Sequence, residues 1–315
     1  GGQVPEELVN VKGIQKVVSI GWGFAALLAD GEVVSWGNSH YASHPETNPE
    51  FTPGETKVID LVSSRGSFAA LRDDGTVAHW GGSVFNTATK DRAHHLANSF
   101  DWNGADDNLK AEKSYTSNYG IAVVRSDSSI ASFARGTGNG LVNIDNSGLK
   151  IEKIVGGEKS FAALRSDGSV IAWGNYMPGG VVNLNVGSPP IRKPVDLVYS
   201  GSQYLDAYGV LFDDGTVQTW GHYKAGGGSL DNYHLNGING DLEIITLKGG
   251  GDQFSVLRSD GSVVSWGSRA PSETPEILSS GVAKLYSASL ALLQDGSIVR
   301  FYNSGGTDII NHFQP

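Results

Sequence analysis

One pattern of apolar and polar residues runs along the chain seven times. Each copy has a short apolar run, a polar turn that contains Asp, and a second apolar-rich run that ends at an aromatic residue. The copies begin at Phe24, Phe68, Ile121, Phe161, Tyr208, Phe254 and Ser289. Two apolar runs joined by a tight turn predict a β-hairpin in every copy.

The copies align on the residue at the turn. The aligned residues are Asp30, Asp74, Asp127, Asp167, Asp214, Asp260 and Asp295. Gly follows each of them except Asp127, which is followed by Ser128. A β-branched residue stands three positions after each Asp, and Trp or Phe stands six positions after it. We expect Asp and Gly to supply the positive-φ positions of a tight hairpin turn.

A further apolar segment precedes most hairpins and predicts a third strand. These segments start at Lys16, Lys57, Lys150, Lys193, Glu243 and Ala283. The turn Asp residues are 35 to 53 residues apart, and repeats of about 40–50 residues with three or four strands are typical of β-propeller blades. The strand before each turn is apolar on both faces, as in Phe-Ala-Ala-Leu, which indicates a sheet covered by a neighbour on each side.

The predicted fold class is therefore all-β, a seven-bladed β-propeller with blades of three to four antiparallel strands. We expect a single propeller domain over residues 1–315, with a loop insertion at 81–113 between blades two and three. The outer strand of the last blade comes from one of two places, Gly1–Val11 or Gly306–Phe313.

The hairpin sequence, roughly G-x-x-F-A-A-L-x-x-D-G-x-V-x-x-W-G-N, resembles the repeat of the RCC1-like (regulator of chromosome condensation) propeller family. The Ala-Leu before the turn and the Trp-Gly after the second strand separate it from WD40 and kelch repeats. The short blades are similar to the compact bacterial type, which includes a seven-bladed β-lactamase inhibitor. The resemblance implies the fold but no single activity, because the family includes exchange factors, enzyme inhibitors and bacterial effectors.

Composition narrows the function classes further. A net charge of −10 argues against nucleic acid as a partner, because phosphates require a basic surface. No apolar run is long enough to insert into a membrane, and the absence of Cys excludes disulfides and thiolate metal sites. The family resemblance, the Gly1-Gly2 start and the lack of Asn-x-Ser/Thr sequons lead us to expect a domain of a longer bacterial protein, secreted or at the cell surface, with the cytoplasm as the alternative location. We expect the isolated domain to be a monomer.

The two ends of the predicted blades differ in variability. Asp-Gly turns occupy one face, whereas the loops on the opposite face differ from blade to blade. That second face carries the candidate partner-binding residues, which are Trp22, Tyr41, Arg65, Trp102, Tyr119, Tyr176, Tyr204, Tyr223 and Asp252. Exposed aromatic residues among Gly, Ser and Asn are typical of protein- or sugar-binding surfaces.

No catalytic, nucleotide-binding or metal-binding motif stands out in the sequence. We therefore expect a non-enzymatic propeller that binds another protein through the variable face, with no cofactor and no metal. The partner's identity stays open. Two alternatives remain: a carbohydrate-binding, lectin-like propeller, and a guanine-nucleotide exchange factor for a small GTPase.

Overall fold

The structure is a computed structural model, and the described residues form seven antiparallel sheets of three or four strands. The all-β prediction is confirmed. The structure describes residues 13–37, 56–81, 109–134, 142–146, 148–174, 182–184, 192–202, 205–228, 242–273, 275–302 and 307–311. Nothing in these ranges is a helix long and apolar enough to cross a membrane. The chain divides into two compact units, Gly1–Ile151 and Glu152–Pro315, and the single seven-bladed domain stays a prediction.

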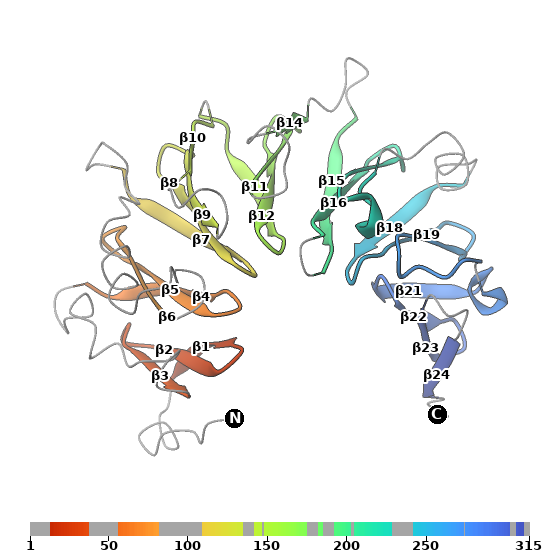
Figure 1. Cartoon of the computed structure of the whole chain (residues 1–315), viewed down its shortest axis with the longest axis horizontal. Helices are drawn as coiled ribbons and strands as arrows, with labels where there is room; N and C mark the ends of the chain where they lie inside the picture. Colours follow the sequence, from red (N-terminus) through yellow and green to blue (C-terminus); the bar gives the residue numbers. More distant parts are fainter. Residues whose placement is uncertain are drawn as a thin grey trace. The chain divides into compact units, whose positions relative to one another are not determined.

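The first unit holds sheets one to three, which follow one another along the chain (Figure 1). Sheet one contains β1 (Ile14–Ile20), β2 (Gly23–Leu28) and β3 (Val33–Gly37). Sheet two contains β4 (Val58–Ser63), β5 (Ser67–Arg72) and β6 (Val77–Gly81). Sheet three contains β7 (Ala111–Ser117), β8 (Gly120–Arg125), β9 (Ile130–Ala134) and β10 (Val142–Ile144).

The second unit holds sheets four to seven. Sheet four contains β11 (Ile151–Gly156), β12 (Ser160–Arg165), β13 (Val170–Gly174) and β14 (Val182–Leu184). Sheet five contains β15 (Pro194–Ser200), β16 (Ala207–Phe212) and β17 (Val217–Gly221), and sheet six contains β18 (Ile244–Gly249), β19 (Phe254–Arg258) and β20 (Val263–Trp266). Sheet seven contains β21 (Val282–Ser287), β22 (Leu290–Leu293), β23 (Ile298–Phe301) and β24 (Thr307–Asn311).

The predicted third strands are confirmed as the first strand of their sheets. The sequence pattern missed the first strand of sheet three, β7, whose residues Ala111–Lys113 were expected in the insertion. Most of that insertion, residues 82–108, lies outside the described residues. β24 pairs with β23, so residues Thr307–Asn311, within the second of the two predicted segments, form the outer strand of sheet seven.

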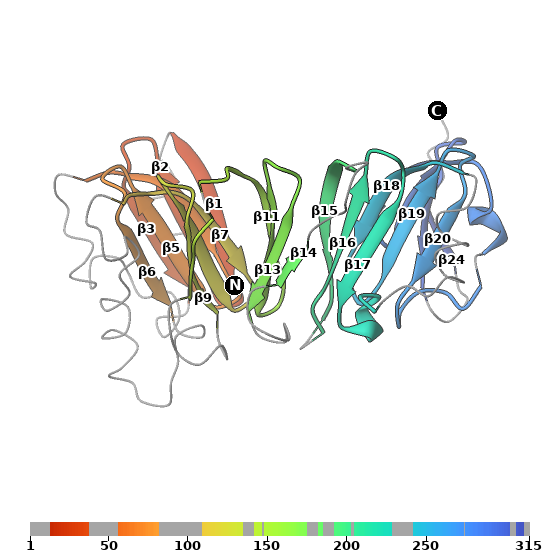
Figure 2. The same ribbon diagram turned by 90° about the horizontal axis from the view of Figure 1, so that it is seen from above.

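Neighbouring sheets within a unit pack face to face through the strand before each Asp turn (Figure 2). Sheets one and two share a buried cluster that includes Leu27, Leu61, Phe68 and Trp80. Similar clusters join sheets two and three, four and five, five and six, and six and seven. Complete burial of one such Phe or Leu side chain contributes about 1.5–3 kcal/mol, so stacking is the main source of stability.

Ring stacking and a close backbone contact explain why the third strand ends in Trp-Gly. In five sheets the Trp ring of the third strand stacks on a Phe or Tyr ring of the second strand, with ring centroids 5.2 to 5.7 Å apart. The following Gly has φ between +104° and +132° in these sheets. A Cβ there would lie 2.3 to 2.7 Å from a backbone carbonyl oxygen of the loop that leads into the second strand. Only Gly permits this close approach.

The turns differ from the expected type. Only one residue of each turn has positive φ: it is Gly in six turns and Ser128, at +69°, in the seventh. The Asp keeps negative φ, and its Oδ1 accepts a hydrogen bond from the N–H two residues later, as from Ser169 to Asp167 over 2.9 Å. The expectation that Asp also takes positive φ is wrong. Asp closes the turn with its side-chain carboxylate, and the residue that follows it is the one left-handed residue of the turn.

Protonation of these turn carboxylates links stability to pH. Burial alone raises the pKa of Asp167, but hydrogen bonds from the Ser169 hydroxyl and N–H, together with Arg165, more than offset it and lower the pKa. Asp74, Asp127 and Asp260 also have lowered pKa values. A carboxylate whose pKa is lower in the folded state than in the unfolded state, about 3.9, stabilises the folded protein at pH values above the unfolded-state pKa. This stabilisation is lost as the pH falls through the folded-state pKa.

We therefore expect the free energy of unfolding to fall as the pH drops below about 4, and Asp167→Asn to make that decline shallower. Urea unfolding of both proteins at a series of acidic pH values measures the difference. An unchanged acid dependence in the variant would contradict the role assigned to the turn carboxylate.

Gly174→Ala should destabilise the protein by about 2 kcal/mol or more. Its Cβ would lie 2.5 Å from the Ser160 Cα, at a φ of +119°. Gly21→Ala is the matched control, because a Cβ at Gly21 makes only an ordinary contact of 3.6 Å with the Arg65 carbonyl oxygen. Denaturant titration measures both, and equal losses would contradict the steric explanation.

Candidate functional site: the loop face

The loop face comprises the loops that join the first and second strands of each sheet, together with the loops that follow each third strand. In an antiparallel meander these loops lie at the end opposite the Asp turns. The residue eight positions before each turn Asp has the same place in the repeat of every sheet. This position holds Trp22, Gly66, Tyr119, Lys159, Asp206, Asp252 and Ser287. In the five sheets with a Trp-Gly pair, the backbone of this residue lies against the Gly, and its side chain varies from sheet to sheet.

In the first unit, the loops of sheets one to three are joined backbone to backbone. The Gly21 N–H donates to the Arg65 carbonyl oxygen over 3.0 Å, and the Arg65 N–H donates to the Asn118 carbonyl oxygen over 2.8 Å. Three loops from sequence-distant segments therefore form one continuous surface. Because backbone groups hold it together, the side chains on it are not needed for the connection.

That surface carries three of the residues predicted from the sequence. Trp22 is 53% exposed. The Arg65 guanidinium donates to the Tyr119 hydroxyl over 3.1 Å and lies 5.7 Å from the centroid of the Tyr119 ring. The cation–π contact and the hydrogen bond to Tyr119 hold the Arg65 side chain in place in the absence of a partner. We call Trp22, Arg65 and Tyr119 the aromatic patch.

In the second unit, side chains link the corresponding loops. Asp206 is almost fully buried and accepts hydrogen bonds from the N–H groups of Glu158 and Lys159, over 2.7 and 3.1 Å. It also accepts from the Ser160 hydroxyl over 2.5 Å. The Tyr208 hydroxyl lies 2.9 Å from that same Ser160 oxygen. One carboxylate thus joins the loop of sheet four to the loop of sheet five.

This buried carboxylate also affects the tyrosines beside it. Burial, followed by the negative charge of Asp206, raises the pKa of both Tyr199 and Tyr208. The two phenols therefore stay protonated at neutral pH. Sequence reasoning missed this network, although an Asp directly before the apolar run Ala-Tyr-Gly-Val-Leu is a signal for a buried, hydrogen-bonded carboxylate.

Asp252 belongs to a similar link between sheets five and six. Its side chain is only 6% exposed, accepts a hydrogen bond from the Ser202 hydroxyl, and lies 3.7 Å from the Arg269 Nε. The residue adopts a positive φ of +64°. In this conformation Asp252 positions Arg269 and the loop, and a direct contact with a partner stays a prediction.

Tyr223 lies in the loop after sheet five and is 69% exposed. It starts a short 3-10 helix, Tyr223–Ala225, and its ring stacks on His222 with centroids 5.0 Å apart. The Trp266 indole N–H fixes the end of this loop by donating to the Gly226 carbonyl oxygen over 3.1 Å. Tyr223 is therefore an exposed ring on an anchored loop.

The other predicted site residues lie outside the described residues: Tyr41, Trp102, Tyr176 and Tyr204. Within the described part of the chain, no group of three His, Cys, Asp or Glu side chains is placed to hold a metal ion. The structure thus brings Trp22, Arg65 and Tyr119 together in one unit and places Tyr223 and Asp252 on the loops of the other.

Comparisons with known proteins concern the fold. No protein-family model and no curated protein matches the chain. The structural neighbours are RCC1-like propellers, as the repeat resemblance predicts. Human WBSCR16 is 14% identical, with 88% of this chain and 80% of that chain covered and a TM-score of 0.49.

Two further neighbours are similar at comparable identity. Prp20p from Saccharomyces cerevisiae, described with its binding to Gsp1p and histones, is 15% identical, covers 84% of this chain and 73% of its own, and has a TM-score of 0.49. The CRINKLY WD40 ectodomain of the Arabidopsis thaliana receptor kinase ACR4 is 17% identical, covers 92% and 93%, and has a TM-score of 0.40.

Asp206→Ala should destabilise the protein by about 3 kcal/mol, because it leaves a buried N–H, a half-buried N–H and a buried hydroxyl without their acceptor. Asp308→Ala is the control, since Asp308 is exposed and accepts only a long hydrogen bond from Tyr302. Chemical unfolding of both variants tests this, and equal stability losses would contradict the role of the Asp206 network.

Proposed function

We propose that this chain is a non-enzymatic recognition domain that binds another protein through its loop face. The observation that carries the proposal is the aromatic patch, in which an exposed Trp, an Arg and a Tyr lie on three loops joined by backbone hydrogen bonds. Trp, Tyr and Arg are the residues most enriched among binding hot spots. Their combination on a fixed backbone is typical of a protein-recognition surface.

The energetics of association favour this surface. A partner loses affinity when it must order loops and long side chains. Here the Arg65 backbone is bonded on both sides, through its carbonyl oxygen and its N–H, and its side chain already rests on Tyr119. Little additional order is required on binding, so the buried area of Trp22 and Tyr119 contributes directly to affinity.

The setting is part of the proposal. The similarity of the short blades to compact bacterial members of the repeat family supports a recognition domain of a secreted bacterial toxin, adhesin or effector, located outside the cell or on its surface. Fractionation of the natural source, followed by detection with an antibody against the chain, tests this location.

A binding assay with matched variants tests the loop face. Three proteins are immobilised and exposed to the same lysates: the wild type, the double variant Trp22→Ala/Arg65→Ala and the control Glu32→Ala/Lys57→Ala. The control side chains are exposed and lie near the Asp turn, opposite the aromatic patch. A partner bound by wild type and control should lose about tenfold or more in affinity for the double variant. Equal binding by all three proteins would refute the proposed surface.

Two further assays separate the alternative functions. Binding to a glycan array that free sugar competes away would instead indicate a carbohydrate-binding propeller. Accelerated nucleotide release from a small GTPase would indicate an exchange factor. Either result, in the absence of a protein partner that depends on Trp22 and Arg65, would overturn the proposal.

A further inference from the structure

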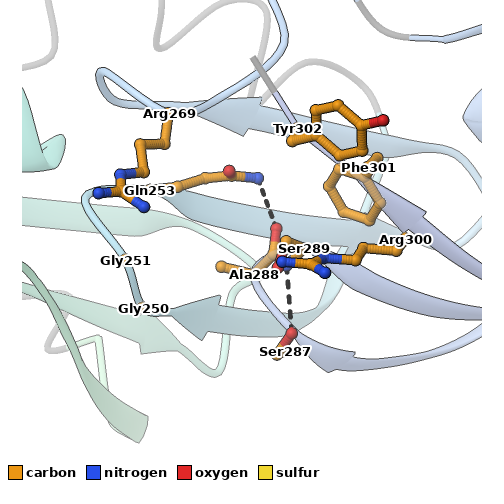
Figure 3. A pocket seen from close by; sticks show the side chains of 10 residues that line it. All are labelled: Gly250, Gly251, Gln253, Arg269, Ser287, Ala288, Ser289, Arg300, Phe301 and Tyr302. Carbon is orange, nitrogen blue, oxygen red and sulfur yellow. Dashed lines mark hydrogen bonds between the residues drawn. The ribbon is translucent and has the colours of Figure 1, made fainter. Parts of the chain in front are cut away.

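A pocket of about 560 Å³ lies among the loop-face residues of sheets six and seven (Figure 3). Its wall comes from the loop before β19, the loop between β21 and β22, the end of β23 and the loop after β20. The lining residues are Gly250, Gly251, Gln253, Arg269, Ser287, Ala288, Ser289, Arg300, Phe301 and Tyr302. Its volume is in the range of pockets that enclose a small molecule or a protruding side chain.

The lining has a strong charge bias. Arg269 and Arg300 are its charged residues, and no Asp or Glu lines the pocket. This positive wall is unusual on a chain whose net charge is −10. Two described carboxylates lie beside lining residues: the buried Asp252, 3.7 Å from the Arg269 Nε, and Asp308, which accepts a 3.4 Å hydrogen bond from the Tyr302 hydroxyl. The pocket therefore favours an anionic group.

A buried amide adds a fixed polar group. Gln253 is 2% exposed, and its Nε2 donates to the Ala288 carbonyl oxygen over 2.5 Å and to the Ser255 hydroxyl over 3.2 Å. The first of these bonds is drawn in Figure 3. With both amide hydrogens committed, Gln253 offers its Oε1 as an acceptor, which suits the backbone N–H of a peptide.

The remaining wall allows close approach by a chain. A Cβ on Gly250 or Gly251 would meet nothing within 4 Å, so the bare backbone of this loop leaves open space at the pocket. The hydroxyls of Ser287 and Ser289 supply further hydrogen-bonding groups, and the Ser289 N–H donates to the Ser287 hydroxyl oxygen over 3.2 Å. Two guanidinium groups, a fixed acceptor and hydroxyl groups match an acidic side chain on a peptide backbone.

We propose that this pocket binds the carboxylate of an Asp or Glu side chain presented by an acidic segment of a protein partner. The inference rests on the proposed protein-binding function and specifies the chemistry of one contact. Arg269 and Arg300 pair with the carboxylate, as guanidinium groups do in charge-assisted hydrogen bonds. Gln253 Oε1 accepts from the peptide backbone and sets its direction.

A defined peptide tests the proposal without the natural partner. The probe is a short, fluorescein-labelled peptide of alternating Gly and Glu with both ends capped, and its twin carries Gln in place of Glu. Fluorescence anisotropy with the full chain should show binding of the acidic peptide only, weakened by added salt. Arg269→Gln and Arg300→Gln should each reduce affinity about fivefold or more.

Arg192→Gln is the matched control. It removes the same charge, but Arg192 lies 3.9 Å from the carboxylate of Asp214, at the Asp-turn end of sheet five, opposite the loop face. It should leave peptide affinity unchanged. Thermal unfolding of all three variants verifies that they fold, as expected because Arg269 and Arg300 are exposed.

Each other outcome is decisive. Equal binding of the Gln peptide, or unchanged affinity in both pocket variants, would overturn the proposal. So would inorganic phosphate binding at the pocket while the acidic peptide does not. The two proposals can also fail separately. If peptide binding depends on Arg269 and Arg300 but partner binding does not depend on Trp22 and Arg65, the aromatic patch is refuted and the pocket proposal is supported.

Discussion

Burial of the second strand between neighbouring sheets is the interaction on which each unit depends. A single sheet of three or four short strands cannot bury its own apolar faces, and stacking against a neighbouring sheet buries them. The Ala pairs of this strand allow backbones to approach closely, and they are fully buried at Ala25, Ala26, Ala69, Ala70, Ala162 and Ala163. Sheets two, five and six are covered by a neighbour on both faces, so in them the two ends of the strands remain to carry function.

The repeat made most of this architecture predictable. An aligned Asp, β-branched residue and Trp fix the hairpin, and Phe-Ala-Ala-Leu indicates cover on both sides. The pattern failed at β7, because Ala-Glu-Lys-Ser-Tyr-Thr-Ser is mostly polar and only its pairing with β8 makes it a strand. It also misassigned the turn conformation, since a sequence shows that Asp and Gly are present but not which of them takes positive φ.

The candidate site was predictable only in part. Exposed Trp22 and Tyr223 were found because aromatic residues outside the repeat pattern have no role in the core. The Arg65–Tyr119 contact and the pocket were not, since they join residues of different sheets whose proximity depends on packing. The burial of Asp252 was not predictable either. A carboxylate in a loop is expected to be exposed, but Asp252 is buried and contacts Ser202 and Arg269.

The two ways of joining loops have different evolutionary consequences. Where main-chain amides make the connection, as at Gly21, Arg65 and Asn118, successive substitutions can reshape the surface while the scaffold persists. Where buried carboxylates such as Asp206 make it, each substitution also removes the hydrogen bonds that hold the loops together. Sequence divergence among descendants of this chain should therefore concentrate on the first three sheets, and directed evolution of new specificities should begin there.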